Sequence, residues 1–299
     1  MPKAKVVVIV GPTASGKSAL AVRLAKRLGG EIISADSRQV YRGLDIGTDK
    51  ITKREMGGVP HHLLDVANPK RQFSAAQYKL LATDSLQYIV ANSKLPIVVG
   101  GAGFYIDVLT KAVTLPDVAP NKTLRKRLGK MSVGKLFEML KKKDSSRAKT
   151  IDHNNKMRLV RALEIIDSLG HIPMLTPSVD MGQEFIFIGL KLEREELEKT
   201  ILARLERQIP ATIRECRRLH RQGLTWKRMH ELGLEYRCIA MYLQNKISKR
   251  EMAAKLYIEI KHYSKRQMTW FKRNKKIKWF KPEEYKRIER YVRMTLLGD

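Results

Sequence analysis

The sequence predicts an α/β fold built on a parallel sheet, with a helical insertion and a helical C-terminal region. Three observations lead to this prediction. Short apolar runs, many of them rich in β-branched residues, end in polar or glycine turns, as buried parallel strands do. A helical pattern follows the first of these runs. Strand patterns are then missing between Leu115 and Gln183, where helix-like stretches replace them.

The first strand is expected at Val6–Val10, an uninterrupted apolar run that precedes a glycine-containing loop. From Ser18 to Leu28 the leucines recur at helical spacing, which predicts a helix directly after that loop. The stretches EIISAD (31–36), LPIVVGGAGFY (95–105) and EFIFIGLKL (184–192) repeat the strand pattern. They predict further strands of the same parallel sheet.

The remaining segments suggest how the chain is divided. Residues 1–115 and 186–299 are expected to form the core with its C-terminal helices, and residues 116–185 a helical insertion domain. Everything after Lys191 is expected to be helical, with Pro210 interrupting the first long helix. Ser248–Glu251 fits a capping box at the start of a later helix.

Composition points to a polyanionic partner. The chain of 299 residues carries a formal net charge of +29, far more than solubility needs, and nucleic acid is the favoured partner. No apolar segment approaches the roughly 20 residues of a membrane span, and the start reads as a strand, so we expect a cytoplasmic protein without a membrane partner. Only Cys216 and Cys238 are present, which predicts neither a disulfide framework nor a structural metal.

Residues 11–18 read GPTASGKS, the phosphate-binding pattern G-x-x-x-x-G-K-[ST] between a strand and a helix. Backbone amides and the helix start hold phosphate oxygens, Lys17 reaches the terminal phosphate, and Ser18 binds Mg²⁺. The sheet is therefore expected to be of the P-loop, nucleotide-kinase-like type. Two consecutive phosphates are recognised, so ATP, GTP and a diphosphate ester all remain possible. The expected phosphate-binding residues are Gly11, Pro12, Thr13, Ala14, Ser15, Gly16, Lys17 and Ser18.

Asp36 ends the second predicted strand, and the carboxyl end of a parallel strand lies at the ligand crevice. Its carboxylate has three possible roles: a ligand of Mg²⁺, a general base for the attacking group, or a cap on the next turn. Neither an NKxD motif nor a second acidic strand end is visible, which argues against a GTPase or a motor ATPase.

Ordered blocks along most of the chain resemble bacterial tRNA dimethylallyltransferases, also called tRNA isopentenyltransferases. A phosphate loop alone would be weak evidence for this family, whereas seven blocks in order are not expected by chance. The blocks are GPTASGKS, ADSRQVYRGLDIGTDK, PHHLLDVANPKRQFSAAQY, IVVGGAGFYIDVL, DHNNKMRLVRALEI, LEREELEKTILARL and YSKRQMTWFKR.

The resemblance implies that dimethylallyl diphosphate supplies a prenyl group to N6 of the adenosine 3′-adjacent to the anticodon, with release of diphosphate. It implies that Thr13 faces the bridging oxygen, Lys17 the outer phosphate and Ser18 the Mg²⁺, and that Asp36 is the general base. A base is needed because the adenine amino group is a weak nucleophile, and such assistance contributes about 10²- to 10⁴-fold.

The resemblance also implies how tRNA is held, since a stacked adenosine must be extruded to reach the base. The insertion and a basic, aromatic-rich stretch at 261–281 are expected to bind the anticodon stem-loop. A monomer suffices for this chemistry. The expected tRNA-binding residues are Asp36, Ser37, Arg38, Gln39, Ala102 (a threonine in the family), Met157, Arg158, Leu159, Val160, Arg161, Lys265 and Arg266.

One diphosphate contact is open at this stage. Some family members use an arginine before an IGY stretch that differs here, and Arg228 or Arg237 is a candidate substitute. Arg194, at the start of a helix after a strand, is another candidate to lie near the phosphates. Other readings of the whole chain are a small-molecule kinase, an adenylate isopentenyltransferase acting on a free nucleotide, and an RNA-binding module with a relic phosphate loop.

Overall fold

The computed structural model describes residues 3–111, 115–173 and 182–298. The chain divides into two compact units, one formed by Met1–Lys111 with Asp180–Asp299 and the other by Ala112–Val179. In the described part, no helix combines the length and the apolar character that crossing a membrane requires.

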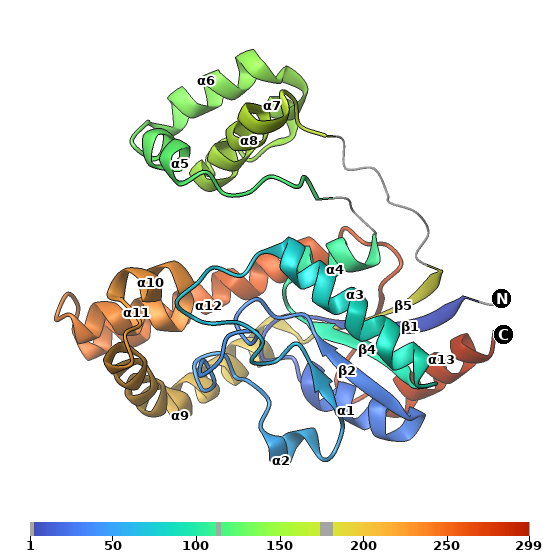
Figure 1. Cartoon of the computed structure of the whole chain (residues 1–299). Helices are drawn as coiled ribbons and strands as arrows, with labels where there is room; N and C mark the ends of the chain where they lie inside the picture. Colours follow the sequence, from blue (N-terminus) through green and yellow to red (C-terminus); the bar gives the residue numbers. More distant parts are fainter. Residues whose placement is uncertain (1–2, 112–114, 174–181, 299) are drawn as a thin grey trace. The chain divides into compact units, whose positions relative to one another are not determined.

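A parallel sheet forms the centre of the first unit (Figure 1). Its order is β3-β2-β4-β1-β5-β6. The strand β1 lies between β4 and β5, and its residues Val6–Val10 are fully buried, as expected for a strand covered on both faces. The strands are β1 (Ala4–Val10), β2 (Gly30–Ser34), β3 (His61–His62), β4 (Leu95–Gly100), β5 (Gln183–Leu190) and β6 (Lys278–Phe280).

Helices cover both faces of this sheet. The helices α1 (Lys17–Leu28) and α13 (Tyr285–Leu297) share one apolar cluster with β1, β4 and β5. The helices α3 (Ala75–Ala91) and α4 (Gly103–Thr110) lie along the other face (Figure 1). The short helix α2 (Lys53–Met56) opens with a capping box at Thr52.

Beyond the sheet, four helices form a second apolar cluster. They are α9 (Arg194–Arg221), α10 (Trp226–Leu232), α11 (Leu234–Leu243) and α12 (Lys249–Phe271). Cys216 and Cys238 are free, buried members of this cluster, and the predicted capping box at Ser248 and Glu251 is formed. This cluster brings α9 and α12 to the carboxyl ends of the strands.

The expectation of an entirely helical C-terminal region is wrong, because β6 pairs in parallel with β5. The strand has three residues, too few to show a periodic pattern. Trp279 packs so closely over Gly189 that an added Cβ at that glycine would lie 2.4 Å from its ring. The strand β3, at the opposite edge, is shorter still.

The predicted break at Pro210 is also wrong, since α9 continues through it. A proline inside a helix removes one hydrogen bond and crowds the preceding turn. Buried contacts on both sides, by Ile201 and Leu205 before it and Ile213 after it, compensate for this cost.

The second unit is a small helical bundle. It consists of α5 (Lys122–Gly129), α6 (Val133–Lys143), α7 (Ser145–Thr150) and α8 (Lys156–Leu169). Asn121, Ser132, Asp144 and Asn155 cap the first turns of these helices with their side chains. Their apolar faces meet in a core of their own. These helices lie within the predicted insertion of residues 116–185, and β5 begins at Gln183, inside its predicted end.

Candidate active site

The phosphate loop (residues 11–18) connects β1 to α1 with the backbone turned inward. Ala14 and Gly16 have φ values of 64° and 80°, both in the left-handed region. Such turns direct successive amide N–H groups into one concave surface, and the α1 N-terminus adds its partial positive charge. The loop thus has the backbone geometry that binds phosphate.

A cavity of about 500 Å³ opens over this loop. Its walls combine the loop residues Thr13–Ser18 with side chains from four other segments: Asp36 after β2, Asp49, Arg204 of α9 and Gln267 of α12. Gly11 and Pro12 lie behind the lining, and both are buried. The cavity therefore brings the predicted loop together with the predicted carboxylate.

Lys17 points back along its own loop. Its Nζ donates a hydrogen bond of 2.6 Å to the carbonyl of Pro12. The pKa of Lys17 is lowered to about 8, mainly by burial; Arg204 contributes to the shift, whereas Asp36 and Asp49 oppose it. Because the surrounding groups compensate the charge of Lys17 only weakly, an anion bound beside it would stabilise the charged form of this side chain.

Asp36 is fixed by its own turn. Its Oδ1 accepts hydrogen bonds from the amides of Arg38 (2.8 Å) and Gln39 (3.3 Å). One oxygen thus performs the capping role, and Oδ2 accepts no hydrogen bond from any described residue. The side chain lines the cavity with Lys17 and Ser18.

The loops after β2 and β4 approach each other closely. An added Cβ at Gly100 would lie 2.1 Å from the carbonyl oxygen of Ala35, so only glycine fits there. The amide of Ala102 donates to the same carbonyl over 3.1 Å. Ala102 itself does not line the cavity, and its neighbours Gly100 and Gly101 do.

Arg204 is a cavity residue that the sequence analysis missed. Its Nη1 donates to Thr13 Oγ1 (2.9 Å) and pairs with Asp49 Oδ2 (3.1 Å). The side chain is 10% exposed, and its buried Nε has no partner within the described part of the chain. The guanidinium therefore lies beside the phosphate loop, and its Nε–H group donates to no described residue.

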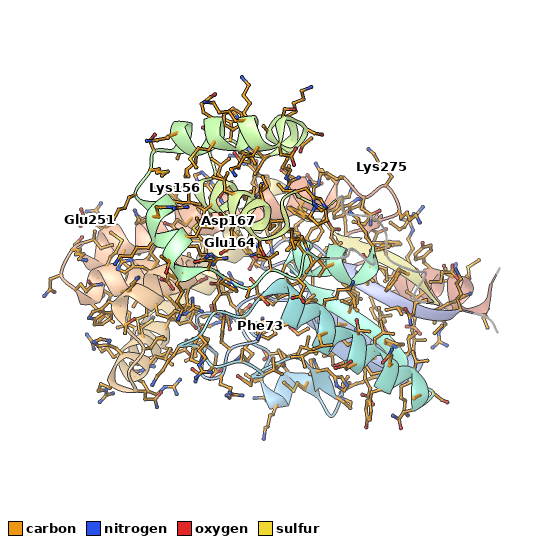
Figure 2. All side chains as sticks on the ribbon, turned by 45° about the horizontal axis from the view of Figure 1, so that its top comes forward. Phe73, Lys156, Glu164, Asp167, Glu251 and Lys275 are labelled. Atoms are coloured by element: carbon orange, nitrogen blue, oxygen red, sulfur yellow. The ribbon has the colours of Figure 1, made fainter. Side chains whose placement is uncertain are left out.

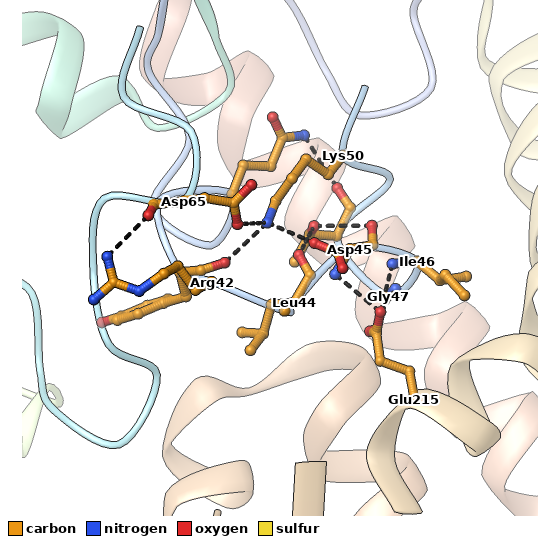
Figure 3. A network of polar contacts seen from close by, with 12 residues as sticks. Arg42, Leu44, Asp45, Ile46, Gly47, Lys50, Asp65 and Glu215 are labelled. Atoms are coloured by element: carbon orange, nitrogen blue, oxygen red, sulfur yellow. Dashed lines mark hydrogen bonds and ion pairs between the residues drawn. The ribbon is translucent and has the colours of Figure 1, made fainter. Parts of the chain in front are cut away.

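The segment that carries Asp49 is held by the buried Glu215 of α9 (Figure 3). Its carboxylate accepts the amides of Asp45 (2.9 Å), Ile46 (2.8 Å) and Gly47 (3.2 Å). The hydroxyl of Tyr236 donates to it over 2.8 Å. In the same network Lys50 pairs with the carboxylates of Asp45 and Asp65.

The residues that follow Asp36, also expected near the extruded nucleotide, differ in whether they line the cavity. Gln39 lines the cavity and donates to the carbonyls of Thr48 and Asp49. Arg38 instead donates to the carbonyl of Leu232 over 2.6 Å, which ties the turn to α10. Ser37 is half-buried and lies outside the cavity lining.

Of the residues expected to bind RNA in the second unit, Leu159 and Val160 are buried in its core. The apolar face of α8 directs both side chains inward, away from the surface of this unit. Met157 and Arg158 are exposed.

Arg161 forms an ion pair with the buried Glu164, which also pairs with Arg125. Burial raises the pKa of this carboxyl, but the hydrogen bonds from Arg125 and Arg161 outweigh it and hold the pKa at about 2. Arg161 therefore has a structural partner inside its own unit.

The basic stretch 261–281 divides between core and surface. Lys265 and Arg266 are exposed on α12, and so is Lys275 beyond it (Figure 2). Phe271 is buried, and Trp270 donates its Nε1 to Asp107 over 3.1 Å. The two aromatics thus anchor the helix, and the cations are left on the surface.

The other arginines considered from the sequence lie outside the cavity lining. The side chain of Arg194 is 85% exposed and pairs with Glu198. Arg228 donates to the carbonyls of Pro69 and Arg71, and Arg237 pairs with Glu259. Arg204, by contrast, lines the cavity.

The oxygen donors of the cavity fit Mg²⁺. Ser18 is exposed in the lining, and Asp36 and Asp49 supply carboxylates. The described residues contain no group of three or more acidic, histidine or cysteine side chains that could hold a metal. Mg²⁺ commonly takes one or two protein ligands and completes its shell with water and phosphate oxygens.

Comparison with known proteins places this site in context. A model of the IPP transferase family matches residues 39–274. The tRNA dimethylallyltransferase of Anoxybacillus flavithermus is 38% identical over 98% of this chain and 95% of its own length. The tRNA dimethylallyltransferase 2 of Treponema denticola is 42% identical over 90% and 92%. The crystal structure of the tRNA isopentenylpyrophosphate transferase from Bacillus halodurans matches with a TM-score of 0.75 and 36% identity, covering 98% of this chain and 97% of that chain.

Proposed function

Since the chain belongs to the IPP transferase family, we propose that it transfers a dimethylallyl group from dimethylallyl diphosphate to tRNA, at N6 of the adenosine 3′-adjacent to the anticodon. The observation that carries the proposal is the cavity that joins a complete phosphate loop to Asp36. The phosphates bound here are the leaving group, and the prenyl group and the acceptor amine meet between loop and carboxylate.

The phosphate loop and Arg204 stabilise the departing diphosphate. As the allylic C–O bond breaks, its electron pair moves onto the diphosphate, where Lys17 and the loop amides meet the growing negative charge. Thr13 Oγ1 is oriented by Arg204, so both groups face the phosphates together. Ser18 would hold Mg²⁺, the proposed cofactor, which would supply further positive charge to the diphosphate.

Asp36 completes the reaction on the acceptor side. The N6 atom forms the new C–N bond with the prenyl group and loses one proton, which Asp36 accepts. Because Oδ1 is occupied by two backbone amides, Oδ2 is the oxygen available for this proton.

The charge of the chain supports tRNA as the partner, and we propose a monomeric enzyme that acts in the cytoplasm. A net charge of +29 and the exposed Lys265 and Arg266 on α12 suit a folded RNA. A monomer suffices for this chemistry and is proposed as the active form. We place the reaction in the cytoplasm, where tRNA is available.

Transfer from labelled dimethylallyl diphosphate to total tRNA, AMP or ATP tests this function. Label should enter tRNA alone and map to the adenosine beside the anticodon. Label in AMP or ATP would instead favour an adenylate isopentenyltransferase. Phosphate transfer from ATP without prenylation would favour a kinase, and tRNA binding without any transfer an RNA-binding module.

A further inference from the structure

Gln267 joins the phosphate loop to the far side of the cavity. It lies on α12, one residue after the exposed Arg266, but its own side chain is only 5% exposed. Its Oε1 accepts the amide of Thr13 over 2.8 Å, and its Nε2 donates to the carbonyl of Gly101 over 2.9 Å. One side chain therefore contacts both the loop after β1 and the loop after β4.

The two partners demand an amide at this position. Thr13 offers a donor and Gly101 an acceptor, so the side chain between them must accept at one atom and donate at the other. This fixes the orientation of the Gln267 amide. A carboxylate would satisfy only Thr13, and an apolar chain would leave both backbone groups unpaired and buried.

The fit leaves no spare room. An added Cβ at Gly101 would lie 2.1 Å from Nε2 of Gln267, so the glycine is what allows the side chain to approach. Gly101 does not adopt a positive φ, and an alanine there would act through this contact rather than through backbone strain.

Thr13 is held from both sides as a result. Gln267 accepts a hydrogen bond from its backbone amide, and Arg204 donates one to its hydroxyl over 2.9 Å. We propose that Gln267 is a positioning residue that sets Thr13, and with it the phosphate loop, in the conformation that receives the diphosphate of the donor. This inference rests on the proposed function for the identity of that ligand.

The test compares Q267M with S264A, since Ser264 is a buried residue one turn earlier on the same helix. Binding of inorganic diphosphate and of dimethylallyl diphosphate is measured by calorimetry, binding of tRNA by filter retention, and kcat and KM by prenyl transfer. In Q267M the Kd for both diphosphates should rise about 10-fold and kcat should fall, with tRNA affinity within about twofold. In S264A all of these values should stay near those of the wild type.

A pair of further variants separates positioning from general destabilisation. G101A should weaken diphosphate binding in the wild-type background by displacing Gln267. In Q267A, where the space is free, adding G101A should cause no further loss. Lower thermal stability in Q267M with unchanged diphosphate affinity, or equal effects of G101A in both backgrounds, would overturn the proposal.

Failure of the proposed function gives a different result. A wild-type protein that binds diphosphate but prenylates no tRNA would contradict that function, and the diphosphate affinities of Q267M and G101A would still decide the role of Gln267.

Discussion

Arg204 Nη1 donates a hydrogen bond of 2.9 Å to Thr13 Oγ1, across 191 positions of sequence. This contact places a permanent positive charge against the phosphate loop. Replacing the side chain in R204Q should raise the KM for dimethylallyl diphosphate about 10- to 100-fold, because a charge-assisted contact to the diphosphate is lost. Steady-state kinetics with tRNA at saturation measure this change.

R194Q is the matched control, since Arg194 lies on the same helix and pairs with Glu198 outside the cavity lining. It should leave the KM for the donor unchanged. Equal effects of the two substitutions would show that helix charge in general, rather than the contact with Thr13, is responsible.

Asp36 can be tested without disturbing its turn. In D36N the Oδ1 atom still accepts the amides of Arg38 and Gln39, but the side chain no longer takes up a proton. Turnover should fall about 10²- to 10⁴-fold. Affinity for tRNA should stay within about twofold. Single-turnover prenylation and filter binding measure the two quantities, and an undiminished kcat would exclude Asp36 as the base.

The sequence predicts the parts of this site that are local and misses those that are not. The loop, its flanking strand and helix, and Asp36 all carry short patterns within the first 36 residues. Gln267 meets Thr13 across 254 positions, and Arg204 lies among other charged residues of α9. No spacing rule distinguishes them, because their roles depend on how α9 and α12 pack at the strand ends. The block that contains Leu159 and Val160 does not separate buried from exposed positions, because a motif runs over both faces of a helix; both side chains are buried.

Lys17 makes donor binding depend on pH. Its pKa of about 8 in the free protein should rise when a diphosphate binds, because the anion stabilises the charged form. Affinity for dimethylallyl diphosphate should therefore fall as the pH passes 8. Calorimetry at pH 8 in buffers of different ionisation enthalpy should detect proton uptake on binding.

The variant K17R checks the assignment, since arginine stays charged throughout this range. Its affinity for the donor, although weaker, should show no decline between pH 7 and 9. A decline as steep as that of the wild type would assign the pH dependence to another group.

Glu215 should be essential to stability. E215A leaves the amides of Asp45, Ile46 and Gly47 and the hydroxyl of Tyr236 without their acceptor. A loss of about 3 kcal/mol in the free energy of unfolding is expected. Urea denaturation measures it. E206A, on the same helix but exposed, should change stability by less than about 0.5 kcal/mol.

Glu235, in the first turn of α11, should make stability depend on pH. Burial raises its pKa to about 7; Arg204 opposes this shift, whereas Asp36 and Asp49 add to it. The folded protein binds this proton more tightly than the unfolded chain does, so loss of the proton lowers the free energy of unfolding. This destabilisation is absent below about pH 4.5, grows as the pH rises from there to 7, and is complete above pH 7.

E235Q removes the destabilisation caused by deprotonation of Glu235 and keeps the size of the side chain. At pH 8 the variant should be more stable than the wild type by about 1–2 kcal/mol, and the two should converge as the pH falls towards 5. Denaturation curves at a series of pH values measure the difference. A constant difference at every pH would mean that Glu235 acts through packing rather than through its proton, because only a titrating group can make the gap between the two proteins close.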